Sequence, residues 1–247
     1  MPDTTRKVAL VTGSATGIGR ATAVRFAREG FAVAVNYSRS QKDAEHTLAE
    51  VKAQGVPAIL CQANVAEDAA VRVMVQRCVA ELGGLDVLVN NAGTTHFIDH
   101  IDLEALTDEV WDEILGVNLK GTFYCCRAAL PALQEREGAI VNVTSVAGLQ
   151  GNGSSIPYAA SKAALNCMTK SLARAFAPRV RVNAVAPGAV LTRWLADHMD
   201  FVERSLLATP MRRAAVPEDI ADAIAFLALG SSLATGQVLV IDGGRTM

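Results

Sequence analysis

Short apolar segments alternate with longer amphipathic ones along almost the whole chain. Four to six residues rich in valine, isoleucine and leucine predict buried strands, and apolar residues three and four apart predict helices. We expect strands at 7–12, 31–36, 56–61, 85–90, 139–144, 180–185 and 237–241. We expect helices at 18–29, 41–54 and 67–82, around 108–134, at 158–176 and near 217–229. Residues 188–215 show no regular period, and an irregular segment is expected there.

The predicted strands are apolar on both faces and are separated by helices. Strands of this kind form parallel sheets that helices cover on both sides. No linker, charge block or repeat divides the sequence. We therefore expect an α/β fold with one doubly wound domain over 1–247 and a seven-stranded parallel sheet.

Composition excludes several classes of protein. The 247 residues carry 23 basic and 25 acidic side chains, a net charge of −2, and the pI is near 6.1. This balance argues against nucleic-acid or anionic-membrane partners. No apolar run is long enough for a transmembrane helix or a signal peptide. The five cysteines lack metal or redox spacing, so we expect no metal and a cytoplasmic location.

The hydrophobic content is higher than in ordinary soluble domains, and a parallel sheet buried on both faces accounts for much of the difference. Counted with glycine and without tyrosine, the apolar share is roughly 57%, against about 45–50% in ordinary soluble domains. The mean hydropathy is +0.25. Because no membrane segment accounts for the extra apolar residues, we expect some of them to be buried at subunit interfaces.

A glycine-rich turn follows the first predicted strand. Gly13, Gly17 and Gly19 precede the first predicted helix, whose N-terminal N–H groups attract phosphate. A P-loop requires lysine after its last glycine, and this chain has Arg20. The turn therefore predicts a dinucleotide site, although a turn needed only for packing has the same composition.

The spacing Gly-x-x-x-Gly-x-Gly, together with motifs further along, resembles the short-chain dehydrogenase/reductase family over essentially the whole chain. These motifs are Asn90-Asn91-Ala92-Gly93, Asn118, Ser145, Tyr158-x-x-x-Lys162, Pro187-Gly188 with Thr192, and Asp242-Gly243-Gly244. The fold implied is a Rossmann-type one. The stretch VNYSRSQKDAE and the overall spacing look most like β-ketoacyl-carrier-protein reductases.

The resemblance assigns residues to two groups. Catalytic roles fall on Asn118, Ser145, Tyr158 and Lys162. Cofactor contacts fall on Gly13, Ser14, Thr16, Gly17, Ile18, Gly19, Tyr37, Ser38, Arg39, Asn64, Val65, Asn91, Ala92, Gly93, Tyr158, Lys162, Pro187, Gly188, Val190 and Thr192. Asn118 corresponds to a helix-kinking asparagine whose carbonyl holds a water in a proton relay to the lysine.

The end of the second strand bears on the choice of cofactor. An acidic residue there would bind the ribose 2′-OH of NAD, whereas a basic one suits the 2′-phosphate of NADP. This chain has Ser38, Arg39 and Ser40, with no acidic residue before Asp43. Thr16 departs from the basic residue that many NADP-using relatives have before the middle glycine. NADP(H) is favoured, and NAD(H) stays open.

Tyr158 and Lys162 are four residues apart on a predicted helix and so share one face. A tyrosine has a pKa near 10, and a nearby ammonium or charged nicotinamide favours the phenolate. Ser145, at a strand end, is placed to donate a hydrogen bond to the substrate oxygen. These residues predict an NADP-dependent oxidoreductase that acts on a ketone or secondary alcohol, with Tyr158 exchanging the proton.

The irregular segment 189–215 is expected to form a lid over the substrate, or a helix packed against the domain. Trp194 and His96 are candidate substrate contacts. The substrate stays open between a 3-oxoacyl thioester, with a possible acyl-carrier partner, and a sugar, polyol or small alcohol. A catalytically silent dinucleotide-sensing protein is the alternative of another class. The family resemblance also implies a homotetramer.

Overall fold

The computed structural model describes residues 5–196 and 198–247, apart from the side chains of Phe201 and Arg204. Its centre is a seven-stranded sheet with strand order β3-β2-β1-β4-β5-β6-β7, in which every neighbouring pair is parallel. The strands are β1 (Val8–Val11), β2 (Ala32–Tyr37), β3 (Ala58–Gln62), β4 (Val87–Asn90), β5 (Ala139–Val143), β6 (Arg181–Pro187) and β7 (Val238–Ile241). The predicted α/β class and the seven-stranded parallel sheet are confirmed.

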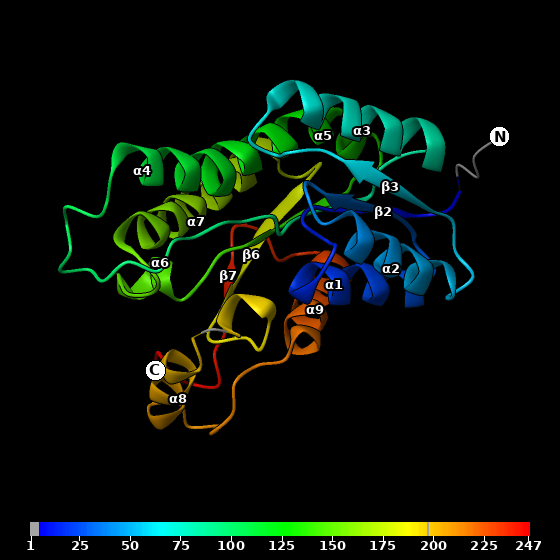
Figure 1. The fold of residues 1–247 in the computed structure, drawn as a ribbon. Helices are drawn as coiled ribbons and strands as arrows, with labels where there is room; N and C mark the ends of the chain where they lie inside the picture. Colours follow the sequence, from blue (N-terminus) through cyan, green and yellow to red (C-terminus); the bar gives the residue numbers. More distant parts are fainter. Residues whose placement is uncertain (1–4, 197) are drawn as a thin grey trace.

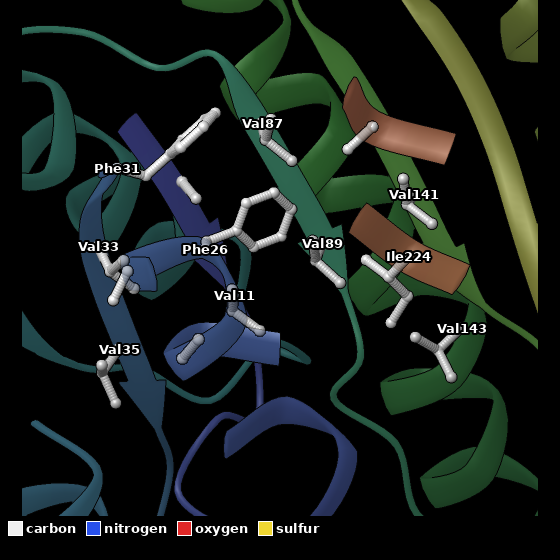
Figure 2. Packing of buried hydrophobic residues seen from close by; sticks show 14 of the residues in the cluster. Val11, Phe26, Phe31, Val33, Val35, Val87, Val89, Val141, Val143 and Ile224 are labelled. Carbon is white, nitrogen blue, oxygen red and sulfur yellow. The ribbon is translucent and has the colours of Figure 1, made fainter. Parts of the chain in front are cut away.

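Alternate residues of each central strand serve two separate cores. In β1, Val8 and Leu10 join one cluster, whereas Ala9 and Val11 join the cluster on the opposite face, and all four are fully buried. Figure 2 shows the second cluster, in which Phe26 reaches from a helix to the strand valines. Burial on both faces explains why these strands are continuously apolar.

Helices cover both faces of the sheet (Figure 1). One face carries α1 (Gly17–Arg28), α2 (Gln41–Lys52) and α9 (Pro217–Ala225), whose apolar residues pack into the cluster with Phe26. The other face carries α3 (Asp68–Leu82), α5 (Thr122–Glu135) and α7 (Ile156–Phe176), with α4 (Asp108–Leu115) beside α7. Among the described residues, no helix is long and apolar enough to cross a membrane.

Two predicted helices are interrupted by π-helical turns. The expected helix around 108–134 consists of α4, the π-turn η1 (Gly116–Gly121) and α5. The helix near 217–229 continues from α9 into the π-turn η3 (Phe226–Gly230). A single π-turn is too short to leave a period of its own, so amphipathic spacing does not distinguish it from an α-helix. Such turns often occur at functional sites, and η1 contains Asn118.

Residues 188–215 are more ordered than their sequence pattern predicts. A 3₁₀ turn η2 (Arg193–Leu195) is followed by α8 (Met199–Leu207), and α6 (Ala147–Gln150) is a further short helix after β5. In Figure 1, α8 stands below the sheet, apart from both helical layers. Short helices of this kind do not leave a detectable period in the sequence.

Candidate active site

A cleft of about 390 Å³ opens at the carboxyl ends of the strands, where the order reverses between β1 and β4. Ligands of open α/β sheets bind at this switch point. All the predicted cofactor residues except Ser14 and Gly19 line the cleft, as do Ser145 and Trp194. Asn118 and His96 do not line it. The fold therefore gathers residues from 13 to 194 around one cavity.

The glycine turn is shaped by close packing against the end of β4. Gly13 and Gly17 have φ values of +60° and +57°, which favour glycine. A Cβ on Gly13 would lie 2.8 Å from the Cα of Ala92. Thr16, the N-cap of α1, makes no side-chain capping bond. The turn thus leaves the N-terminal amides of α1 available, and this donor set fits a diphosphate.

Ser14 and Gly19 support this turn from behind. The buried Ser14 hydroxyl donates to the carbonyl of Val11 at 2.7 Å and accepts the backbone N–H of Asn36 at 3.0 Å. A Cβ on Gly19 would lie 2.5 Å from the carbonyl oxygen of Gly13. Neither residue lines the cleft, and their direct contact with the cofactor stays a prediction. Their place in the structure is to hold the turn.

Asn36 is a structural contributor that the sequence reasoning missed. Its Oδ1 accepts the Gly13 N–H at 3.0 Å, and its Nδ2 donates to the carbonyls of Cys61 and Ala63, both at 3.1 Å. The side chain is 2% exposed. A buried asparagine must satisfy its polar groups, and here it ties β2 and β3 to the glycine turn. An asparagine at the end of an otherwise apolar strand was the available signal.

Thr12 and Asn91 form the matching connection on the other side of β1. The Thr12 Oγ1 accepts the N–H groups of Asn91 and Ala92, both at 3.0 Å. The Asn91 Nδ2 donates to the carbonyls of Thr12 and Gly13 at 2.9 and 3.0 Å. This double bridge fixes the glycine turn relative to β4 and explains why asparagine is required at position 91.

The end of β2 and the start of α3 form the far end of the cleft. Tyr37 is buried, whereas the side chains of Ser38 and Arg39 are exposed. The Asn64 Oδ1 accepts the N–H of Ala66 at 3.2 Å, so part of its polar capacity shapes the loop before α3. Val65 lies against Gly121, where a Cβ would be 2.9 Å from the Val65 Cγ2. The π-turn η1 therefore packs directly behind this wall.

Ser145, Tyr158 and Lys162 converge on the middle of the cleft. Ser145 follows β5, and the other two lie one turn apart on α7. The buried Lys162 Nζ donates to the carbonyl of Val143 at 2.9 Å and lies 5.6 Å from the centroid of the Tyr158 ring. Burial lowers the pKa of Lys162 to about 8. The helix and strand thus place an ammonium, a phenol and a hydroxyl at one cavity.

The pKa of Tyr158 in the protein without cofactor is higher, not lower, than that of an ordinary tyrosine. Burial raises this pKa from 10.0 to about 12, while the neighbouring Ser145 hydroxyl acts in the opposite direction. The expected lowering by the Lys162 ammonium is not found, because the desolvation of the phenolate dominates. In this state Tyr158 is a neutral phenol at pH 7 and can donate a proton.

Asn118 holds the loop after β4 against the catalytic helix. Its Oδ1 accepts the N–H of Thr94 at 2.8 Å, and its Nδ2 donates to the Thr94 carbonyl at 3.0 Å and to the Ser161 Oγ at 3.1 Å. Asn118 is completely buried. Its side chain therefore positions the surroundings of Lys162, a role that the sequence pattern did not indicate.

The predicted lid segment 189–215 begins at the cleft and crosses it. Thr192 lies beside Gly17, whose added Cβ would be 3.2 Å from the Thr192 Cγ2. Trp194 is 41% exposed, and its ring stands edge-on to Tyr158 with centroids 6.3 Å apart. The stacked rings of Phe97 and His198 connect α8 to the loop after β4. Asp197, within this segment, lies outside the described residues.

His96 is bonded to a residue at the edge of the cleft. Its Nε2 lies 2.8 Å from the Glu113 Oε2, and Phe97 and Glu113 line the cleft whereas His96 does not. The substrate contact of His96 stays a prediction. Within residues 5–196 and 198–247, no group of three or more potential ligands could hold a metal ion.

A doubly wound sheet with a glycine turn at its switch point defines the class of dinucleotide-binding α/β proteins. The family described as enoyl-(acyl carrier protein) reductase matches residues 13–246. A candidate ketoacyl reductase of the granaticin polyketide synthase of Streptomyces violaceoruber is 47% identical over 96% of this chain and 95% of its own. The 3-oxoacyl-(acyl-carrier-protein) reductase FabG of Staphylococcus aureus is 43% identical over 98% of each chain.

Solved structures agree with these relatives. A short-chain dehydrogenase from Burkholderia cenocepacia, crystallised with NADP, superposes with a TM-score of 0.92. It is 35% identical and is matched over 99% of this chain and 100% of its own. The chain belongs to the short-chain dehydrogenase/reductase family. It is an NAD(P)-dependent enzyme, which excludes the alternative of a silent sensing protein.

Proposed function

We propose that this enzyme reduces 3-oxoacyl thioesters with NADPH, and that these substrates are presented on an acyl-carrier protein. The observation that carries the proposal is the convergence of Ser145, Tyr158 and Lys162 on the cleft that the glycine turn opens. The names of the two reductase relatives support the substrate class. The NADP-bound relative and the exposed Arg39 support the cofactor.

The residues divide the work of binding and proton transfer. The N-terminal amides of α1 would hold the diphosphate, and Arg39 with Ser38 would hold the 2′-phosphate. When bound, the reduced nicotinamide supplies a hydride to the carbonyl carbon. Ser145 donates a hydrogen bond to the carbonyl oxygen, and Tyr158 transfers its hydroxyl proton to that oxygen. The Lys162 ammonium stabilises the resulting phenolate.

In the protein without cofactor, burial raises the pKa of Tyr158 to about 12, so the phenol carries its proton at neutral pH. Reduction of a ketone consumes this proton, whereas oxidation of an alcohol requires the tyrosine to accept one.

A second candidate is reduction of a 2-enoyl thioester, which the description of the matched family names. The two reactions share a cofactor but differ in where the proton goes, since enoyl reduction places it on carbon. A hydroxyl pair directed at one oxygen favours the carbonyl substrate. Acetoacetyl and crotonyl thioesters, each on a carrier protein and on a small thiol, separate the two candidates.

The test follows nicotinamide absorbance with both thioesters and with NADPH or NADH. We expect oxidation of NADPH with acetoacetyl thioester and none with crotonyl thioester, with a higher kcat/KM for the carrier-bound form. A preference for crotonyl thioester would establish the second candidate instead. Activity on polyols or sugars that exceeds activity on both thioesters would refute the proposed substrate class.

A homotetramer is also proposed. The edge strand β7 is only half-buried although Val238, Leu239, Val240 and Ile241 are all apolar. Phe123 on α5 and Phe226 beside α9 are 41% and 53% exposed. Burial of these residues between subunits would absorb the apolar surplus of the composition. Light scattering at micromolar concentration tests this, and a stable monomer would contradict it. The cytoplasmic location stays a prediction from the sequence.

A further inference from the structure

Arg193 connects the lid segment to the far side of the dinucleotide cleft. Its Nη1 lies 3.0 Å from the Asp43 Oδ2, and its Nη2 donates to the Ser40 Oγ at 3.2 Å. Asp43 lies in the first turn of α2, and Ser40 follows the strand end at which Arg39 lies. The contact therefore joins residues 150 positions apart across the mouth of the cleft.

We propose that Arg193 determines the choice of NADP(H) by exchanging its bond to Asp43 for a bond to the 2′-phosphate. This inference rests on the proposed use of NADP(H). It adds a second cation to Arg39, and this cation comes from the lid rather than from the loop after β2.

Both arginines are placed for a shared anion. Arg39, Ser40 and Arg193 line the same cleft. In the part of the chain that the structure describes, Arg39 has no carboxylate within ion-pair distance. A 2′-phosphate carries close to two negative charges, and guanidinium groups bind phosphate oxygens through paired hydrogen bonds. Arg39 and Arg193 would thus both contact the phosphate, together with the Ser40 hydroxyl to which Arg193 already donates.

The existing ion pair is suited to exchange. The Arg193 and Asp43 side chains are 57% and 49% exposed. An ion pair in water contributes little to stability, so a dianion competes for the guanidinium readily. While the pair is intact, Arg193 also neutralises Asp43, whose carboxylate would otherwise repel the phosphate.

The exchange acts on lid position as well as on affinity. Thr192, next to Arg193 in sequence, lies over Gly17 of the phosphate-binding turn. Trp194, on the other side, reaches the Tyr158 ring. A phosphate that holds Arg193 therefore also holds the residue beside the diphosphate and the residue beside the proton donor. NAD(H), which lacks the phosphate, leaves this connection dependent on the contacts of Arg193 with Asp43 and Ser40.

Calorimetry with nicotinamide-free fragments tests the proposal without turnover. The ligands are 2′-phospho-ADP-ribose and ADP-ribose, bound to the wild type, Arg193→Ala, Arg193→Lys and Asp43→Asn. For Arg193→Ala we expect the Kd of the phosphorylated fragment to rise about tenfold, since one charge-assisted contact is lost, while the Kd of ADP-ribose changes less than about twofold. Arg193→Lys should fall between the wild type and the alanine variant because it keeps charge without the paired geometry.

Asp43→Asn should change the Kd of the phosphorylated fragment in the opposite direction to Arg193→Ala. Removing the carboxylate frees Arg193 and removes a repulsive charge, so the Kd of the phosphorylated fragment should fall about threefold. Arg72→Ala is the matched control, because Arg72 forms an exposed pair with Asp68 on α3 and does not line the cleft. It should leave both dissociation constants unchanged.

The outcomes separate this inference from the proposed function. Equal weakening of both fragments in Arg193→Ala would mean that Arg193 only holds the lid, and would overturn the inference. Loss of phosphate preference in Arg39→Ala but not in Arg193→Ala would also overturn it and leave the proposed use of NADP(H) intact. A wild type that binds both fragments equally would refute the proposed cofactor itself.

Discussion

The two sides of the cleft are built in different ways. The frame, which we define as the turn Thr12 to Gly19 with Asn36 and Asn91, is held by short buried side chains and backbone hydrogen bonds. At the start of the lid segment 189–215, the exposed side chains of Arg193 and Trp194 meet the body through an ion pair with Asp43 and an edge-on contact with Tyr158. The frame is fixed by packing, whereas these two exposed contacts can be displaced at small cost.

This difference indicates a division of labour. Groups that must be placed accurately for proton transfer, Ser145, Tyr158 and Lys162, are carried by β5 and α7, which belong to the packed body. Arg193 and Trp194, which we propose to act in selecting cofactor and substrate, lie on the exposed segment. Rigid elements preserve catalytic geometry, and segments of low local stability provide opening and closing.

The largest effect should come from the proton donor on the rigid side. Tyr158→Phe removes the hydroxyl, and we expect kcat to fall by about 10²–10⁴-fold, the usual contribution of a general acid. NADPH affinity, measured by fluorescence titration, should change less than about twofold because the ring stays in place.

Tyr124→Phe is the control for this substitution, since Tyr124 lies on α5 and does not line the cleft. Near-normal turnover of Tyr158→Phe would show that the assignment of the acid to the rigid side is wrong.

The next effect tests the rigidity of the frame. In Gly19→Ala, the added Cβ would lie 2.5 Å from both the Gly13 carbonyl oxygen and the Asn91 Nδ2. Because the turn must shift, NADPH affinity should fall about 100-fold, as expected when a binding group moves by about 1 Å. Overpacking should also lower the free energy of unfolding by about 1–3 kcal/mol.

Gly30→Ala is the contrast for this variant, because Gly30 has φ of +83° and nothing within 4 Å of an added Cβ. It should lose about 1 kcal/mol of stability from backbone strain and keep NADPH affinity. Equal affinity loss in both variants would show that the frame is no more sensitive than an ordinary turn.

The buried Lys162 predicts a pH dependence of stability. Its folded pKa of about 8 lies below the ordinary lysine pKa of 10.5, so the unfolded state binds more protons between these values. The free energy of unfolding contributed by Lys162 should therefore rise by about 2 kcal/mol between pH 7.5 and pH 9.5.

Urea unfolding of the wild type and of Lys162→Met at both pH values measures this rise. The buried cysteines, whose pKa values are raised by burial, titrate alike in both proteins, so the difference between the two reports Lys162. A difference that does not change with pH would mean that the Lys162 ammonium is solvated.

The smallest effect should come from the lid. Trp194→Ala removes an edge-on aromatic contact with Tyr158, an interaction of about 0.5–1.5 kcal/mol. We expect KM for the thioester to rise about three- to tenfold, with kcat changed less than twofold. Leu207→Ala, which alters an exposed residue of α8 outside the cleft, should change neither. A fall in kcat alone would place Trp194 with the catalytic groups.

Much of the site was predictable because its spacing is local. Tyr158 and Lys162 meet because they are four apart on one helix, and Gly13, Gly17 and Gly19 lie in one turn. The packing of Ser14 and Gly19 behind the turn and the pairing of His96 with Glu113 were not predictable in this way. Whether a side chain faces a cavity or its supporting wall depends on neighbours such as Asn36 and Glu113, which are distant in sequence.

Local sequence patterns were sufficient to predict the alternation of strands and helices, the parallel sheet and the reactive side chains at its carboxyl edge. These features follow from hydrophobic periodicity and short-range spacing, which act within one element. Tertiary structure alone decided the π-turn around Asn118, the pKa of Tyr158 near 12 and the contact of Arg193 with Asp43. Each of these depends on desolvation or on contacts between segments that only folding brings together, and no local pattern encodes such energies.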